Sequence, residues 1–212
     1  MVAQPTAAVD LYWIPLGADG HSVRFNGKVY EAIVAAWQHR GRCDLYHAAL
    51  VVELDGSRYT IEIAPSPDAD EPSRGVVRTG AVGSRYLGWL RLFRYEVRRW
   101  RGGSIPDLAE AVGGARRLTT DAVVTRRLLS AVADVPTPVW GRDELEAGEM
   151  WNSNSMIAWV IHTAGLPTAD LKPPPRGRAP GWNAGLAVAR RAEGYERHVR
   201  RSRRPSARHA NA

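Results

Sequence analysis

Residues 156–164, MIAWVIHTA, form a mostly apolar run whose bulky side chains cover every side of the helix that the run predicts. Such a helix has no face to turn to water, so other layers must bury it on most sides. Gly165 and Pro167 end the run, because glycine commonly terminates helices and proline cannot continue them. We expect this segment to be a central, buried helix.

Four small polar residues, Asn152 to Ser155, stand directly before this helix. The first backbone amides of a helix lack partners within it, and the side chain of Asn152 or Ser153 can accept from them. That role explains one or two of the four residues. The N-terminus of a buried helix also offers partial positive charge and amide donors, which suit a nucleophile or an oxyanion. The cluster is thus a helix cap, a candidate catalytic site, or both.

A β-hairpin is predicted from two alternating segments, 45–54 and 57–63, that flank Asp55 and Gly56. With this two-residue turn, opposite residues have numbers that sum to 111, and alternation sorts the side chains onto two faces. One face, predicted to be core, carries Ala48, Leu50, Val52, Leu54, Tyr59, Ile61 and Ile63. The other carries His47, Ala49, Val51, Glu53, Arg58, Thr60 and Glu62.

On the second face, Glu62 is the diagonal neighbour of His47, about 7–8 Å away between backbones. A carboxylate at this position can orient the imidazole ring. The alternative is a half-exposed polar face with a cross-strand charge pattern and no chemical role.

The remaining pattern predicts a mixture of strands, helices and turn-rich connections. The predicted elements are strands at 10–16 and 91–100, helices at 28–40, 104–114 and 119–135, and a surface loop or lid at 65–75. Thr119 or Thr120 is expected to cap the helix that ends before Pro136.

The 212 residues suit one domain, which we assign to residues 1–189, followed by a basic, mobile tail at 190–212. The net charge is +7, of which the tail contributes +6 through eight Arg and two Glu. The tail is solvated, or contacts RNA, DNA or an anionic membrane. Because no apolar run approaches the roughly 18 residues of a membrane span and no signal peptide precedes the domain, we expect a cytoplasmic protein.

Two places in the chain resemble the circularly permuted papain-like fold, which includes NlpC-like peptidases, the PPPDE group and the lecithin retinol acyltransferase group. They are the early strand histidine in DLYHAALVV and, about a hundred residues later, the cluster WNSNSM. The resemblance implies an α+β domain whose antiparallel sheet packs against a buried central helix. It matches His47 to the catalytic base, Ser153 to the nucleophile and Asn152 to the residue before it, with Ser155 as the alternative register and Asn154 between them.

The chain departs from these families in one respect, because serine stands where they have cysteine. A hydroxyl does not ionise near neutral pH, so Ser153 needs His47 to remove its proton, with Glu62 or an Asn orienting the ring. Cys43, four residues before His47, is a rival nucleophile or a packed thiol. The spacing of the histidines and the lack of a Gly-rich phosphate loop predict no metal and no cofactor.

Three functional interpretations follow. The first is hydrolysis or transfer of an amide, isopeptide or ester group on a peptide or lipid substrate, as the resemblance implies. The second is a catalytically silent module of the same fold that binds a peptide or lipid. The third is nucleic-acid or anionic-surface binding through the Arg-rich tail, which predicts a steep loss of binding with salt.

Overall fold

The computed structural model describes residues 6–16, 44–65, 75–90 and 93–202. This part of the chain folds into an α+β domain with a seven-stranded sheet. The strand order is β4 (Val76–Ala81), β5 (Arg94–Arg101), β3 (Ser57–Pro65), β2 (Asp44–Leu54), β1 (Ala7–Pro15) and β6 (Arg116–Thr119). All these neighbours are antiparallel, and short β7 (Gly177–Arg178) pairs with the start of β2 in parallel.

The predicted hairpin is confirmed, including its register. Residues 50–54 of β2 pair with residues 57–61 of β3, and Leu50 lies opposite Ile61 as expected. Asp55 and Gly56 have φ values of 49° and 72°, the left-handed conformation that a two-residue turn of this type requires. Gly56 adopts it without strain because it has no Cβ.

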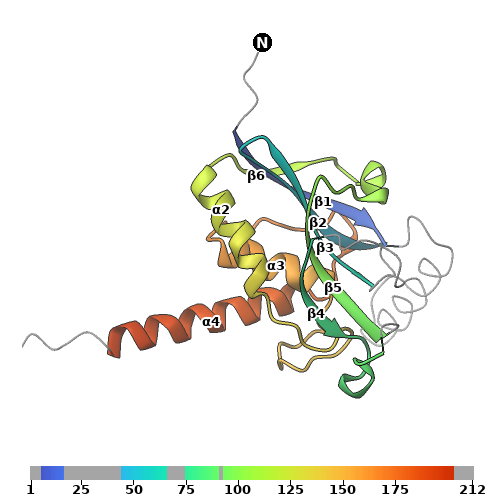
Figure 1. Cartoon of the computed structure of the whole chain (residues 1–212), viewed down its shortest axis with the longest axis vertical. Helices are drawn as coiled ribbons and strands as arrows, with labels where there is room; N and C mark the ends of the chain where they lie inside the picture. The colour runs from blue at the N-terminus through green and yellow to red at the C-terminus, as the bar shows by residue number, and fades with distance from the viewer. Residues whose placement is uncertain (1–5, 17–43, 66–74, 91–92, 203–212) are drawn as a thin grey trace, which may run out of the picture.

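One face of the sheet carries the main core, and three helices cover it (Figure 1). They are α2 (Ala122–Ala131), α3 (Ser153–Thr163) and α4 (Trp182–Ser202). Met156, Ile157, Val160 and Ile161 of α3 have no exposed area, because α3 lies between the sheet and the other helices. The expectation of a central, buried helix that ends near Gly165 is confirmed.

The opposite face of the sheet is also buried, which the alternation pattern did not predict. Ile14, Ala49, Val51 and Ile105 form a second, smaller core on this face. The segment that holds η3 (Pro106–Glu110) covers it, and the amide of Val112 donates to the carbonyl of Trp13 on β1. A half-exposed polar face is therefore wrong for this part of the hairpin.

Strand β5 shows the same burial on its charged side. The sequence predicts a solvated face for Arg94, Glu96 and Arg98, but Glu96 and Arg98 are only 8% and 4% exposed. Their charges compensate each other, since the Arg98 guanidinium lies 2.9 Å from the Glu96 carboxylate. Alternation identifies which side chains share a face, whereas burial depends on what later packs against it.

Three helices differ from expectation. The helix predicted at 104–114 is only the short 3₁₀ helix η3. Asp121 caps α2 instead of Thr119 or Thr120, and its carboxylate accepts from the amides of Val123 and Val124. Helix α4 continues to Ser202, so the first thirteen residues of the predicted mobile tail are helical. The described residues do not include 203–212, the predicted helix at 28–40 or positions 66–74 of the predicted loop. In the ranges that the structure describes, we find no helix both long and apolar enough to cross a membrane.

Candidate functional site

The N-terminus of α3 is closed by a capping box that uses two residues of the polar cluster. The Asn152 side chain accepts from the amides of Asn154 (2.9 Å) and Ser155 (3.3 Å). In return, the Ser155 hydroxyl accepts from the Asn152 amide at 3.1 Å and lies 3.2 Å from the Met150 carbonyl, to which it donates. Ser155 is fully buried and its hydroxyl serves the cap, whereas Ser153 is half-buried and takes no part in the capping box.

Asn154 ties α3 to the sheet at the position of His47. Its side-chain oxygen accepts from the Ala48 amide at 2.7 Å, and its nitrogen donates to the Tyr46 carbonyl at 3.0 Å. The carboxamide thus occupies the place of a neighbouring strand, beyond the point where the pairing of β2 with β3 ends at Leu50. The backbone at His47, between the two bonded residues, therefore lies beside the start of α3, whereas the His47 side chain is on the face of the sheet opposite α3.

His47 itself is half-buried and shares the second face of the sheet with its partner Ile14. Burial lowers the pKa of its imidazole to about 4, because desolvation penalises the charged ring. The ring is therefore neutral at pH 7. Within the described ranges, neither this ring nor the half-buried Ser153 hydroxyl forms a hydrogen bond.

Glu62 does not take the position that the hairpin geometry predicts for it. Beyond Ile61, strand β3 continues along β5, and Glu62 lies opposite Arg98. Its carboxylate is 3.7 Å from the Arg98 guanidinium, which also pairs with Glu96. The expected diagonal contact with His47 assumed that β2 and β3 stay paired along their whole length, and the two strands separate before they reach His47.

One amide at the start of α3 has no acceptor among the described residues. Asn152 donates its own amide to Ser155 and accepts from those of Asn154 and Ser155, and the Met156 amide bonds to the Asn152 carbonyl. Of these first amides, that of Ser153 has no acceptor among the residues that the structure describes. It sits at the positive end of the helix dipole, next to the Ser153 hydroxyl.

Pro180 and Gly181, which lead into α4, cover the polar cluster at 152–155, and we call them the roof. The Pro180 carbonyl accepts from the side-chain nitrogens of both Asn152 and Asn154 at 2.9 Å. Gly181 has a φ of 84°, and a Cβ there would lie 2.5 Å from the Asn152 side-chain oxygen and 2.6 Å from the Ser155 hydroxyl. This roof was missed in the sequence, although the Pro-Gly pair marks a backbone position with special requirements.

The other candidate residues lie elsewhere. The described residues do not include Cys43, His21, His39 or His209. His162 lies near the C-terminal end of α3, with its Nε2 3.4 Å from the Glu193 carboxylate on α4. A search of the described residues found no group of three or more His, Cys, Asp or Glu that could hold a metal ion.

A groove of about 400 Å³ lies beside the roof, between the 168–179 segment and the first turns of α4. Its lining includes three apolar residues, Leu171, Trp182 and Leu186, and three basic ones, Lys172, Arg178 and Arg190. Glu149 also lines the groove, but its carboxylate accepts from the Gly181 amide at 2.8 Å. The basic side chains outnumber this one carboxylate, so the groove favours anionic groups.

Comparisons of the chain with protein-family models, with curated proteins and with solved structures found no match. The likeness to the permuted papain-like fold rests on His47 and on the cluster at 152–155.

Proposed function

We propose that the chain hydrolyses or transfers an acyl or amide group at a site formed by Ser153 and His47, on a fold of the permuted papain-like type. The observation that supports this most is the bridge from Asn154 to the backbone on both sides of His47. This bridge holds the backbone at His47 beside the residue that follows Ser153, although the two segments are distant in sequence.

In this proposal, the Ser153 oxygen attacks the substrate carbonyl while the His47 ring takes its proton. A hydroxyl needs such a base, and His47 has the neutral, accepting ring that the step requires. The amide of Ser153 donates to the developing oxyanion, assisted by the dipole of α3. His47 then returns the proton to the leaving amine or alcohol, and water or a second acceptor releases the acyl group from Ser153.

A second candidate is a silent binding module of the same fold, with a peptide or lipid held beside α3. It is favoured by the contact of Glu62 with Arg98, since a carboxylate that orients the ring is part of most serine-histidine sites. The serine in place of cysteine favours it too, because an imidazole activates a thiol far more readily than a hydroxyl.

Hydrolysis of p-nitrophenyl esters of several chain lengths separates these candidates. If the first is right, the natural protein is active, Ser153→Ala and His47→Gln lose the activity, and the exposed helix variant Ser130→Ala keeps it. If the second is right, the natural protein is inactive and Ser153→Cys gains activity. Inactivity of both the natural protein and Ser153→Cys, with folding intact by circular dichroism, would overturn the placement of a site at this junction.

A further inference from the structure

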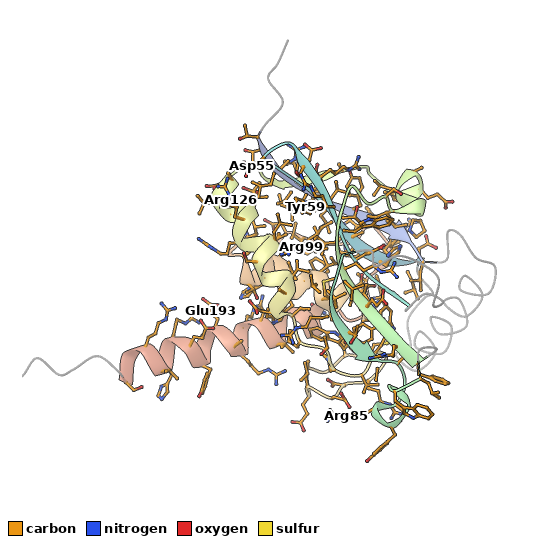
Figure 2. All side chains as sticks on the ribbon, in the orientation of Figure 1. Asp55, Tyr59, Arg85, Arg99, Arg126 and Glu193 are labelled. Carbon is orange, nitrogen blue, oxygen red and sulfur yellow. The ribbon has the colours of Figure 1, made fainter. Side chains whose placement is uncertain are left out.

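Helix α4 has two unlike halves, and its second half leaves the body of the domain (Figure 1). In the first half, Trp182, Ala184, Leu186 and Ala189 are buried. From Arg190 to Arg200, every residue is exposed except the half-buried Val199. Residues 190–202, which we call the projecting half, extend about 20 Å at 1.5 Å per residue. Figure 2 shows side chains above and below this part of the helix, where Glu193 is labelled.

Nearly half of the net charge of the chain, which is +7, lies on this projecting half. Residues 190–202 contain five Arg against two Glu, which gives +3 with histidine neutral. Residues 1–189 contain 21 basic and 20 acidic side chains, so the body is close to neutral. A basic helix on a neutral domain produces a local field that attracts polyanions.

The charge forms a strip that begins in the groove. Asn183, Arg190 and Arg197 are spaced by seven residues and therefore lie on one side of α4, and Asn183 and Arg190 line the groove. Lys172 and Arg178 line the same groove. We call Lys172, Arg190 and Arg197 the basic strip. Arg197 also contacts Glu193 at 2.8 Å, but both side chains are more than half exposed, so this pair is weak and opens readily.

We propose that the basic strip and the projecting half of α4 bind the phosphates of double-stranded DNA, independently of sequence. The ligand must be extended, because the strip runs from the groove outward along α4. Guanidinium groups pair with phosphate oxygens through two parallel bonds. The major groove of B-DNA is wide enough to admit an α-helix, whereas that of duplex RNA is too deep and narrow for side chains to read.

A membrane surface is the less suitable occupant. Helices that lie on membranes bury a broad apolar face, rich in Trp, Phe or Leu, at the lipid boundary. The larger apolar side chains of residues 190–202 are Tyr195, which is 71% exposed, and Val199. This proposal does not depend on catalysis at Ser153.

The test is fluorescence anisotropy of the full chain with a labelled 20-base-pair DNA duplex of mixed sequence, between 50 and 200 mM NaCl. With about four phosphate contacts, the logarithm of affinity falls with slope about −3.6, which is roughly a 150-fold loss over this range. The double variant Arg190→Gln/Arg197→Gln removes two contacts, so its loss is only about 12-fold and it binds more weakly at 50 mM. Circular dichroism verifies that α4 remains helical in this variant.

Arg126→Gln is the matched control, because Arg126 is exposed on α2 and pairs with Asp55 away from the basic strip (Figure 2). It should leave affinity and salt slope unchanged. Absent or salt-insensitive DNA binding would overturn the proposal, as would an equal effect of the control variant. Binding to phosphatidylserine vesicles without binding to the duplex would overturn it in favour of a membrane surface.

Discussion

Replacing Asn154 by Ala should destabilise the domain strongly, because this one side chain joins α3 to the sheet. Its three bonds reach the Ala48 amide (2.7 Å), the Tyr46 carbonyl (3.0 Å) and the Pro180 carbonyl (2.9 Å), and the residue is 3% exposed. The Pro180 carbonyl keeps its bond from Asn152 in the variant, so two backbone groups lose their partner. At about 1–3 kcal/mol for each, the free energy of unfolding falls by roughly 2–6 kcal/mol.

Urea denaturation followed by tryptophan fluorescence measures this change. Asn183→Ala is the control, since Asn183 is exposed and its bond to Glu149 is 3.3 Å long; we expect a change of at most about 0.5 kcal/mol. Asn154→Asp is the isosteric variant: it keeps the acceptor for Ala48 but sets a carboxylate against two carbonyls. Its deficit relative to the natural protein should shrink from pH 7 to pH 4, as the carboxyl is protonated and donates. A loss below 1 kcal/mol for Asn154→Ala would refute the bridging role.

Three further predictions concern the rest of the structure. The folded pKa of His47, about 4, lies below its ordinary 6.5, so the unfolded chain binds the proton more readily: stability should be full above pH 6.5 and fall by up to about 3 kcal/mol toward pH 4. In urea denaturation of His47→Gln at several pH values, this loss of stability toward pH 4 should be absent. An unchanged pH dependence would contradict the low pKa of His47. Gly185→Ala should lower the melting temperature markedly, because a Cβ there meets the Ser155 backbone; a thermal scan equal to that of the natural protein would disprove this contact. Tyr95→Phe should cost about 1 kcal/mol in urea denaturation, because its buried hydroxyl donates to the Pro138 carbonyl at 2.8 Å; a neutral effect would count against that bond.

Local patterns predicted the local structure well. The Asp55–Gly56 turn and its register depend on neighbouring residues alone, and both are confirmed. The same holds for α3, whose apolar circumference required burial and whose start required a cap such as Asn152. These features need no knowledge of distant contacts.

The features that depend on tertiary contacts were not predicted from the sequence, or were predicted only in part. Glu62 pairs with Arg98 because β5 lies along the other edge of β3, while the pairing of β3 with β2 ends at Ile61, and no local signal marks where two strands separate. The charged side of β5 is buried by later packing. The length of α4 was missed because an Arg-rich segment suits a solvated helix as well as a mobile tail.

The candidate site shows the same division. The sequence identified the cluster at 152–155 but did not assign its members: Asn152 and Ser155 form the cap, Asn154 bridges to β2, and Ser153 is left with its hydroxyl and amide. Only the folded chain distinguishes these roles, because they depend on β2 and on the roof at Pro180.

Covalent labelling shows whether Ser153 is a nucleophile that His47 activates. The protein is treated with a fluorophosphonate at pH 7.5, digested and mapped by tandem mass spectrometry. If His47 activates Ser153, we expect one adduct, on Ser153, that forms much more slowly in His47→Gln and is absent from Ser153→Ala. An unlabelled natural protein, or an adduct on another residue that persists in Ser153→Ala, would contradict it.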